Sequence, residues 1–348
     1  MDILYQRMSR VFDEDIKFKL EEIDRIMAKK YKLEHPMKER DWRTYEQQFS
    51  HRIKTAMKEL DPLVKEVVST THIHHGPGHP YGLSLENRVR RHLIKQLVEE
   101  SNRMFSNMLV IFSMLSGIDV SYKSVERLYS DQEVILAFHS LHILILKNKG
   151  IDSSEATGDG TGYSPTIKKN YESYAQRLKD NAKENSKDSN RNGRSGRRRL
   201  FAYSFFMMDL KTGMYVAFGS SMKSERGAYD RALGMLGSTG ITLSSLRLDR
   251  YHSSPSYMDA LKGTKTFLIS RKNWMLNGSV EWKSMMKDFL LNTVPYLEQY
   301  HQRSNSESGF AADKKMLGQN VAQRRNDRID SAIFCKGLWH NLFNIGRS

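Results

Sequence analysis

The spacing of apolar residues predicts that residues 1 to about 70 are helical. In DEDIKFKLEEIDRIMAKKYKLE and WRTYEQQFSHRIKTAMKELDPLVKEVV, apolar side chains recur every three or four positions between charged ones, which is the period of an amphipathic helix. A further long amphipathic helix is expected in LSLENRVRRHLIKQLVEESNRMFSNMLVIFSML and ends near Gly117. Two short helices, in SYKSVERLYS and DQEVILAFHSLHILILK, follow it. This pattern is compatible either with a helix-turn-helix DNA-binding motif or with a small helical bundle.

The pattern changes after Gly150, where short apolar runs with turn residues between them replace long helical periods. The expected order is a strand, an insertion, a β-hairpin, a helix, a strand, a short helix, a strand and C-terminal helices. The segments that carry these elements are SSEATGDGTGYS, LFAYSFFMMD with GMYVAFGSS, SERGAYDRALGMLG, SSLRLDRY, SPSYMDALKG and TKTFLIS. The sequence thus predicts an all-helical region over residues 1–150, followed by an α/β domain over residues 151–348 whose mixed sheet is flanked by helices.

Charge adds a candidate partner. The 348 residues include 55 Lys and Arg against 40 Asp and Glu, a net charge of +15. Such a balance favours a polyanion such as DNA, because each neutralised phosphate releases counterions, although a basic protein can also be merely soluble. Part of the charge lies in SKDSNRNGRSGRRR, inside an insertion at about 165–200. This tract is expected to be a mobile basic loop, in which Arg197, Arg198 and Arg199 are candidate DNA contacts.

The cysteine count, the apolar runs and the N-terminus indicate the cellular compartment in which we expect the protein. Cys335 is the only cysteine, so neither an intrachain disulfide nor a cysteine-based zinc site can form. The most apolar runs are shorter than the roughly 18 residues of a membrane span, and the N-terminus lacks the apolar core of a signal peptide. We therefore expect a cytoplasmic protein that binds DNA in the same compartment and does not enter a membrane.

Two aspartates are candidates for phosphodiester chemistry, which needs an activated oxygen nucleophile and a stabilised leaving oxygen. Asp159 is expected at the end of the first strand, where Gly158 and Gly160 leave the backbone open to a bulky substrate. Asp249 ends the SSLRLD strand, so both carboxylates share one sheet edge if the strands are neighbours. The ordinary alternatives are an Asp-Gly turn at Asp159 and a surface ion pair between Asp249 and Arg250.

A third acidic candidate lies in YHQRSNSESGFAADKK. Tyr300, Arg303, Glu307 and Lys314 stand at offsets of 0, 3, 7 and 14. On one helix these offsets fall within a stripe about 60° wide, although the Ser, Asn and Gly residues between them are poor helix formers. A carboxylate among a phenol and two cations suits contact with phosphates beside a scissile bond. Alternatively, Arg303 and Glu307 form an ordinary i,i+4 pair.

Together these residues resemble the DDE transposases of bacterial and archaeal insertion sequences. One branch of that family carries a Y-(2)-R-(3)-E-(6)-K signature, which Tyr300, Arg303, Glu307 and Lys314 match at every position. DGTG at Asp159 and LDRYHS at Asp249 resemble the two aspartate motifs, and AIFCKGLWHNLFNIG resembles the helix after the glutamate. The resemblance covers residues 150–348. Only about 58 residues separate Asp249 from Glu307, which leaves little room for the β-rich insertion that some relatives use to form hairpin ends.

The resemblance implies a ribonuclease-H-like fold in which Asp159, Asp249 and Glu307 bind two Mg²⁺ ions, with Mn²⁺ able to substitute. Tyr300, Arg303 and Lys314 would contact the backbone of the transposon end. Double-stranded DNA and a homodimer in a synaptic complex are the implied partners, in a prokaryotic cytoplasm. Two other functions stay open: a metal-dependent nuclease without strand transfer, and a DNA-binding protein derived from a transposase.

Overall fold

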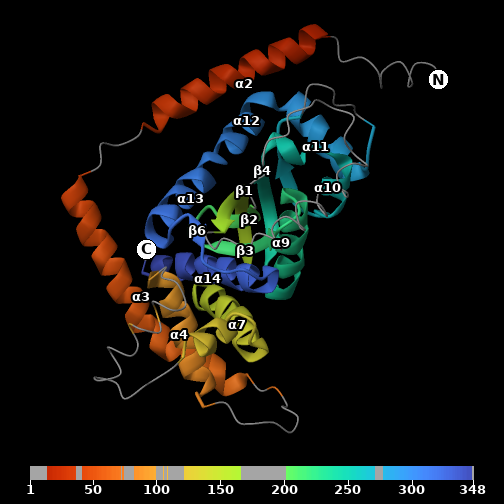
Figure 1. Ribbon diagram of the computed structural model, residues 1–348. Coiled ribbons are helices and arrows are strands. Elements are labelled where there is room, and N and C mark those ends of the chain that lie inside the picture. Colours follow the sequence, from red (N-terminus) through yellow and green to blue (C-terminus); the bar gives the residue numbers. More distant parts are fainter. Residues whose placement is uncertain are drawn as a thin grey trace, which may run out of the picture.

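The computed structural model describes residues 14–36, 41–71, 73, 82–98, 105, 108, 121–165, 201–270 and 277–346. These residues form a mixed open sheet flanked by helices, preceded by a helical N-terminal region (Figure 1). The predicted fold class is confirmed at this level. The proposed division at residue 150 stays a prediction, and the basic tract with Arg197, Arg198 and Arg199 lies outside the described residues.

The N-terminal region consists of helices with clear sequence signals at their ends. The α7 helix, for example, begins after Asp131, whose carboxylate accepts hydrogen bonds from the backbone N–H groups of Glu133 and Val134. It ends at Asn148, and Gly150 just beyond it has a φ of 71°, a conformation that favours glycine. The helices are α2 (Glu14–Glu34), α3 (Trp42–Thr70), α4 (Leu85–Val98), α6 (Tyr122–Leu128) and α7 (Gln132–Asn148). Apart from Phe105 and Met108, the predicted continuation of α4 toward Gly117 lies outside the described residues.

The sheet has the order β3-β2-β1-β4-β5, and the short strand β6 pairs with the far end of β1. β1 runs antiparallel to β2 and parallel to β4, which in turn is parallel to β5. The strands are β1 (Ser153–Pro165), β2 (Ala202–Asp209), β3 (Tyr215–Ser221), β4 (Thr242–Leu248), β5 (Lys265–Phe267) and β6 (Asn320–Val321). The predicted hairpin is β2–β3, and β1 to β5 follow one another in the predicted order, whereas the short β6 among the C-terminal helices was not predicted. β1 lies at the centre, with partners on both sides.

Helices cover both faces of this sheet. The α9 helix (Glu225–Thr239) packs on β2 and β3, whereas α13 (Ser304–Leu317) and α14 (Asn326–Asn344) pack on the opposite face (Figure 1). The α14 helix also joins the two parts of the chain, because Trp339 is fully buried and its Nε1–H donates to Leu93 O in α4 at 2.8 Å. The remaining elements are the short helices η1 (Arg250–His252) and α10 (Pro255–Asp259), and the helices α11 (Val280–Leu291) and α12 (Thr293–His301).

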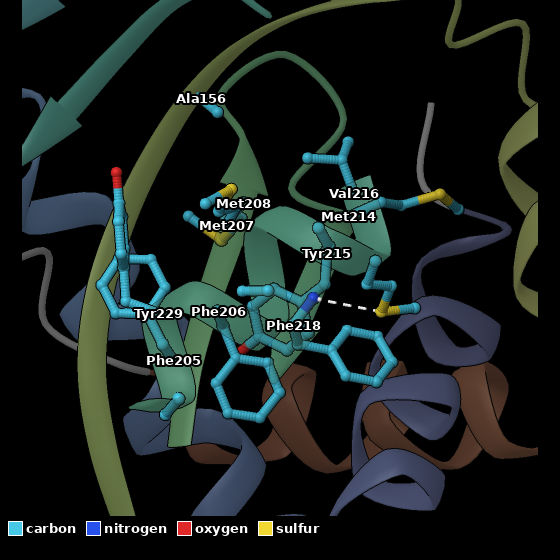
Figure 2. Packing of buried hydrophobic residues seen from close by; sticks show 14 of the residues in the cluster. Ala156, Phe205, Phe206, Met207, Met208, Met214, Tyr215, Val216, Phe218 and Tyr229 are labelled. Atoms are coloured by element: carbon cyan, nitrogen blue, oxygen red, sulfur yellow. Dashed lines mark hydrogen bonds between the residues drawn. The ribbon is translucent and has the colours of Figure 1, made fainter. Parts of the chain in front are cut away.

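The hairpin β2–β3 contributes many of the buried side chains of the core. Figure 2 shows its buried aromatic and methionine side chains interleaved, with the backbone N–H of Phe218 donating to the sulfur of Met235 at 3.4 Å. Phe206 contacts the rings of both Tyr215 and Phe218. Such close packing makes the strands a rigid support for side chains at the sheet edge. Within the described part of the chain, no helix is long and apolar enough to cross a membrane.

Candidate active site

Asp159 and Asp249 lie side by side on neighbouring parallel strands. The register pairs Gly158 of β1 with Leu248, the last residue of β4, so the next residue of each chain segment is an aspartate. The two strands are therefore neighbours, which is the condition under which the sequence places both carboxylates at one edge of the sheet. Asp249 caps η1, where its Oδ2 accepts from the Tyr251 backbone N–H at 3.4 Å.

The predicted position of Asp159 at a strand end is wrong. Asp159 is the seventh of the 13 residues of β1, and the strand continues to Pro165. It continues because β2 pairs with it as far as Tyr163 and β6 then pairs with Ser164 and Pro165. β4 ends at Leu248, so no described parallel strand pairs with β1 between Asp159 and Tyr163.

The glycines around Asp159 have a different use from the predicted one. A Cβ on Gly158 would lie 2.7 Å from the Phe205 ring, and one on Gly160 would lie 2.4 Å from Glu225 Oε1. The space beside β1 is therefore filled by side chains of this chain, and not left open for a substrate. None of these glycines needs a positive φ, so packing alone requires them.

Arg303 connects the first aspartate to the glutamate. Its Nη1 donates to Asp159 Oδ2 at 2.8 Å and its Nη2 to Glu307 Oε1 at 3.0 Å. The Arg303 and Asp159 side chains are only 20% and 16% exposed, whereas Glu307 is 59% exposed. One guanidinium thus bridges two of the three predicted catalytic carboxylates.

The four signature residues do not share one helix, so that prediction is wrong. Tyr300 belongs to α12, the chain turns at Gln302 and Arg303, and Glu307 and Lys314 belong to α13. Tyr300 is 8% exposed, while Lys314 lies about two turns beyond Glu307. Direct contact of these side chains with DNA stays a prediction.

The turn between α12 and α13 is fixed to the sheet at two points. The Arg303 carbonyl accepts from the Thr157 hydroxyl of β1 at 3.4 Å. Arg247 of β4, which is 1% exposed, donates from Nε to the Gln299 carbonyl at 3.2 Å and from Nη2 to its side-chain oxygen at 2.6 Å. The helix turn that carries Arg303 is therefore aligned with both aspartate strands. No sequence pattern indicated that Arg247, inside a strand, has this role.

The electrostatics show how crowded the carboxylates are. Burial raises the pKa of Asp159, the Arg303 charge and the Gly160 N–H lower it, and the charges of Asp249 and Glu307 raise it again. For Arg303, burial lowers the pKa, but the charges of Asp159 and its neighbours outweigh this and raise it. The three acids and the guanidinium are thus one interacting group.

Glu225 is a fourth acid in this group and was missed from the sequence. It is the first residue of α9, after the N-cap Ser224. Burial raises its pKa, and the charges of Asp159 and Asp249 raise it further. A glutamate in the first turn after a serine is an ordinary helix start, so only the run of alternating glycines in β1 hinted that something packs against that face.

The chemistry of these side chains fits a hard divalent cation, since Mg²⁺ prefers carboxylate oxygens. Their arrangement does not yet gather them: among the described residues, no three His, Cys, Asp or Glu side chains are grouped so as to hold a metal ion. Arg303 lies between Asp159 and Glu307 instead. A cation bound by both Asp159 and Glu307 would have to displace this guanidinium.

A comparison with known proteins adds a relative. Over 294 residues the chain is 39% identical to the probable transposase for insertion sequence element ISA1214 of Archaeoglobus fulgidus, covering 84% of this chain and 85% of that protein. No family model matches the chain, and no solved structure matches it. Identity at this level over most of both chains is enough to assign the family. The acidic residues described above therefore belong to a member of that family. The chain belongs to the family of insertion-sequence transposases.

Proposed function

We propose that this protein cleaves transposon ends and joins them to target DNA at a metal site formed by Asp159, Asp249 and Glu307. The observation that carries the proposal is the adjacency of Asp159 and Asp249 on parallel strands, with Glu307 linked to the first of them through Arg303. A relative named as a probable transposase supports the reaction class. The mixed sheet flanked by helices supports a ribonuclease-H-like fold.

Bound Mg²⁺, for which Mn²⁺ is expected to substitute, would supply an activated oxygen nucleophile and stabilise the leaving oxygen. The chain's own contribution is to hold the ligands in register. β1 and β4 fix the aspartates, while the turn before α13 sets the position of Glu307. Because burial and crowding raise the pKa of Asp159, a cation at this site also relieves repulsion among the carboxylates.

Recognition of DNA is assigned to the basic residues. The net charge of +15 favours a polyanion. Arg303, just before α13, and Lys314, about two turns beyond Glu307 in that helix, would contact backbone phosphates beside the scissile bond together with Tyr300. The tract with Arg197, Arg198 and Arg199 would track the duplex. Two copies of the chain, one on each transposon end, would form the synaptic complex.

Asp159→Asn tests the catalytic proposal. The substrate is a duplex that carries the DNA ends flanking the protein's own coding sequence, and products are separated on denaturing gels with Mg²⁺ or Mn²⁺. We expect the variant to lose cleavage while its DNA binding, measured by gel shift, stays close to that of the unaltered protein. Asp152→Asn, an exposed aspartate just before β1, is the matched control and should cleave normally.

Three results would contradict the proposal in different ways. Normal cleavage by the Asp159→Asn variant would exclude the assigned site. Cleavage without joined products would indicate a nuclease that lacks strand transfer. DNA binding without cleavage by the unaltered protein would indicate a transposase-derived DNA-binding protein.

A further inference from the structure

The α2 helix packs along the outside of α12 (Figure 1). On the side that faces α12, Met27 is buried against the core. The Lys30 ammonium donates to the Glu298 carboxylate of α12 at 3.3 Å. One turn earlier, Asp24 Oδ1 lies 3.3 Å from His301 Nε2 at the end of α12. One side of α2 therefore accounts for its attachment to the rest of the chain.

The other side of α2 carries apolar residues that this attachment does not use. Phe18, Ile26 and Leu33 are 63%, 57% and 80% exposed, which makes them three of the five most exposed large apolar side chains in the described part of the chain. The exposed Glu22 and Lys29 lie between them. At 100° per residue these five positions fall within a stripe about 80° wide. Single apolar residues on a surface are ordinary, but a stripe along one helix indicates an interaction surface.

This stripe is complementary to a second copy of itself in the antiparallel direction. Phe18 and Leu33 are centred on the same point as Glu22 and Lys29, midway between Ile26 and the residue before it. A two-fold axis at that point would place Phe18 opposite Leu33 and Glu22 opposite Lys29, twice each. The two copies of Ile26 would meet at the centre, each about 0.8 Å along the helix from the axis. A parallel pairing would instead bring like charges together.

The charged residues of the stripe are not used elsewhere in the described part of the chain. The ion pairs of α2 with described residues involve Asp24, Lys30 and Glu34, and neither Glu22 nor Lys29 takes part in one. An exposed pair of opposite charges contributes little to affinity but fixes partner and register. The charge pattern therefore specifies the antiparallel direction, and the apolar residues provide the contact area.

We propose that α2 is a dimerisation helix, which pairs antiparallel with α2 of a second copy of this chain through Phe18, Glu22, Ile26, Lys29 and Leu33. The inference rests on the proposed function for the use of the dimer, in which each copy would hold one transposon end. The contact itself requires neither DNA nor metal. A single pair of helices is a small interface, so we expect a weak dimer that binding to one DNA substrate strengthens.

Cysteine substitution tests both the pairing and its direction. Cys335 is the only native cysteine and is buried, so a thiol placed on α2 is the accessible one. Ile26→Cys should form a disulfide-linked dimer under mild oxidation. Phe18→Cys and Leu33→Cys should cross-link with each other when mixed but not with themselves, since like positions would lie about 22 Å apart. Leu291→Cys, at a 70% exposed position in α11, is the control and should stay monomeric.

Charge reversal tests the assigned ion pairs while keeping the apolar surface. Glu22→Lys should weaken self-association, measured by sedimentation equilibrium, by about tenfold, because like charges replace opposite ones at two places. Lys29→Glu should have the same effect. The double variant Glu22→Lys/Lys29→Glu should dimerise like the unaltered protein, since each pair is restored with its signs exchanged. A double variant as weak as the single ones would overturn the pairing.

The outcomes separate this inference from the proposed function. Self-linking of Phe18→Cys or Leu33→Cys would exclude the antiparallel direction. A protein that stays monomeric at every concentration, with and without a DNA duplex, would assign the stripe to another occupant, and either result overturns the inference. Cleavage and joining of DNA by such a monomer would leave the proposed function intact. Cross-links without any DNA cleavage would support the dimer and contradict the proposed function alone.

Discussion

Removal of the Arg303 guanidinium should strengthen cation binding in the absence of DNA. Arg303 occupies Asp159 Oδ2 and Glu307 Oε1, at 2.8 and 3.0 Å, which are oxygens that a metal ion would need. In this arrangement the guanidinium competes with the cation for the same charge. Arg303→Met keeps an apolar side chain of similar length in the turn before α13 and removes that competition.

The size of the effect follows from the exposure of the two pairs. The Arg303–Asp159 pair is 20% and 16% exposed, and a hydrogen bond between charged groups contributes about 1.5–3 kcal/mol. The pair with Glu307, which is 59% exposed, contributes only about 0–1 kcal/mol. Since each 1.4 kcal/mol is a tenfold change, release of the first pair should tighten Mn²⁺ binding by about 10–100-fold.

Titration calorimetry with Mn²⁺ on DNA-free protein measures this change. Arg231→Met is the control, because it removes an equal charge from a pair with Asp330 on α14, away from the carboxylates. Added DNA should narrow the difference between Arg303→Met and the unaltered protein, since phosphates offer Arg303 another partner. Unchanged or weaker Mn²⁺ binding by Arg303→Met would refute the competition and make Arg303 a residue that positions the ligands.

Two further predictions concern stability. Burial lowers the pKa of His92 to about 3 and of His142 to about 4, against 6.5 when unfolded, so both are neutral in the fold and protonate first in the unfolded chain. The free energy of unfolding should therefore be highest above pH 6.5 and should fall as the pH drops toward 4, by up to about 1.4 kcal/mol per pH unit for each histidine. Urea unfolding at pH 7 and pH 5 measures this decrease. An equal decrease in the double variant His92→Gln/His142→Gln would contradict the assignment to these histidines. Arg247→Met should lower the free energy of unfolding by about 1–3 kcal/mol, because it leaves two partly buried oxygens of Gln299 without this donor. It should also reduce cleavage more than Lys287→Met, a surface change in α11, does, and equal cleavage by the two would show that the turn does not depend on Arg247.

The sequence was sufficient to place the two aspartates because their positions depend on local patterns. A strand, a hairpin, a helix and a second strand, in that order, bring the second strand beside the first when the connection crosses over a helix. β1, the hairpin β2–β3, α9 and β4 follow this path. The identity of the neighbouring strands then sets Asp159 and Asp249 next to each other.

The length of β1 and the role of Glu225 depended on contacts that local patterns do not contain. Glycine has a low strand propensity, so DGTG predicts the end of a strand. The Phe205, Glu225 and Phe201 side chains instead pack into the spaces that Gly158, Gly160 and Gly162 leave. Glu225 reaches Gly160, beside Asp159, only because α9 returns over the sheet after the hairpin, which is a tertiary contact between residues 65 positions apart.

The signature spacing itself is better explained by a break between helices than by one helical stripe. The backbone N–H groups of Arg303, Asn305 and Ser306 donate to the carbonyls three residues before them, at 3.0, 3.1 and 3.1 Å, so the chain is wound more tightly here than in an α-helix. This turn lets Arg303 face Asp159 while its carbonyl accepts from Thr157. Glu307 then lies one turn into α13, where it can share the same guanidinium. An intact helix through Gln302 would still pair Arg303 with Glu307, but it would lack the tight turn that brings Arg303 against β1. The poor helix formers after Arg303 allow this turn and are therefore part of the site.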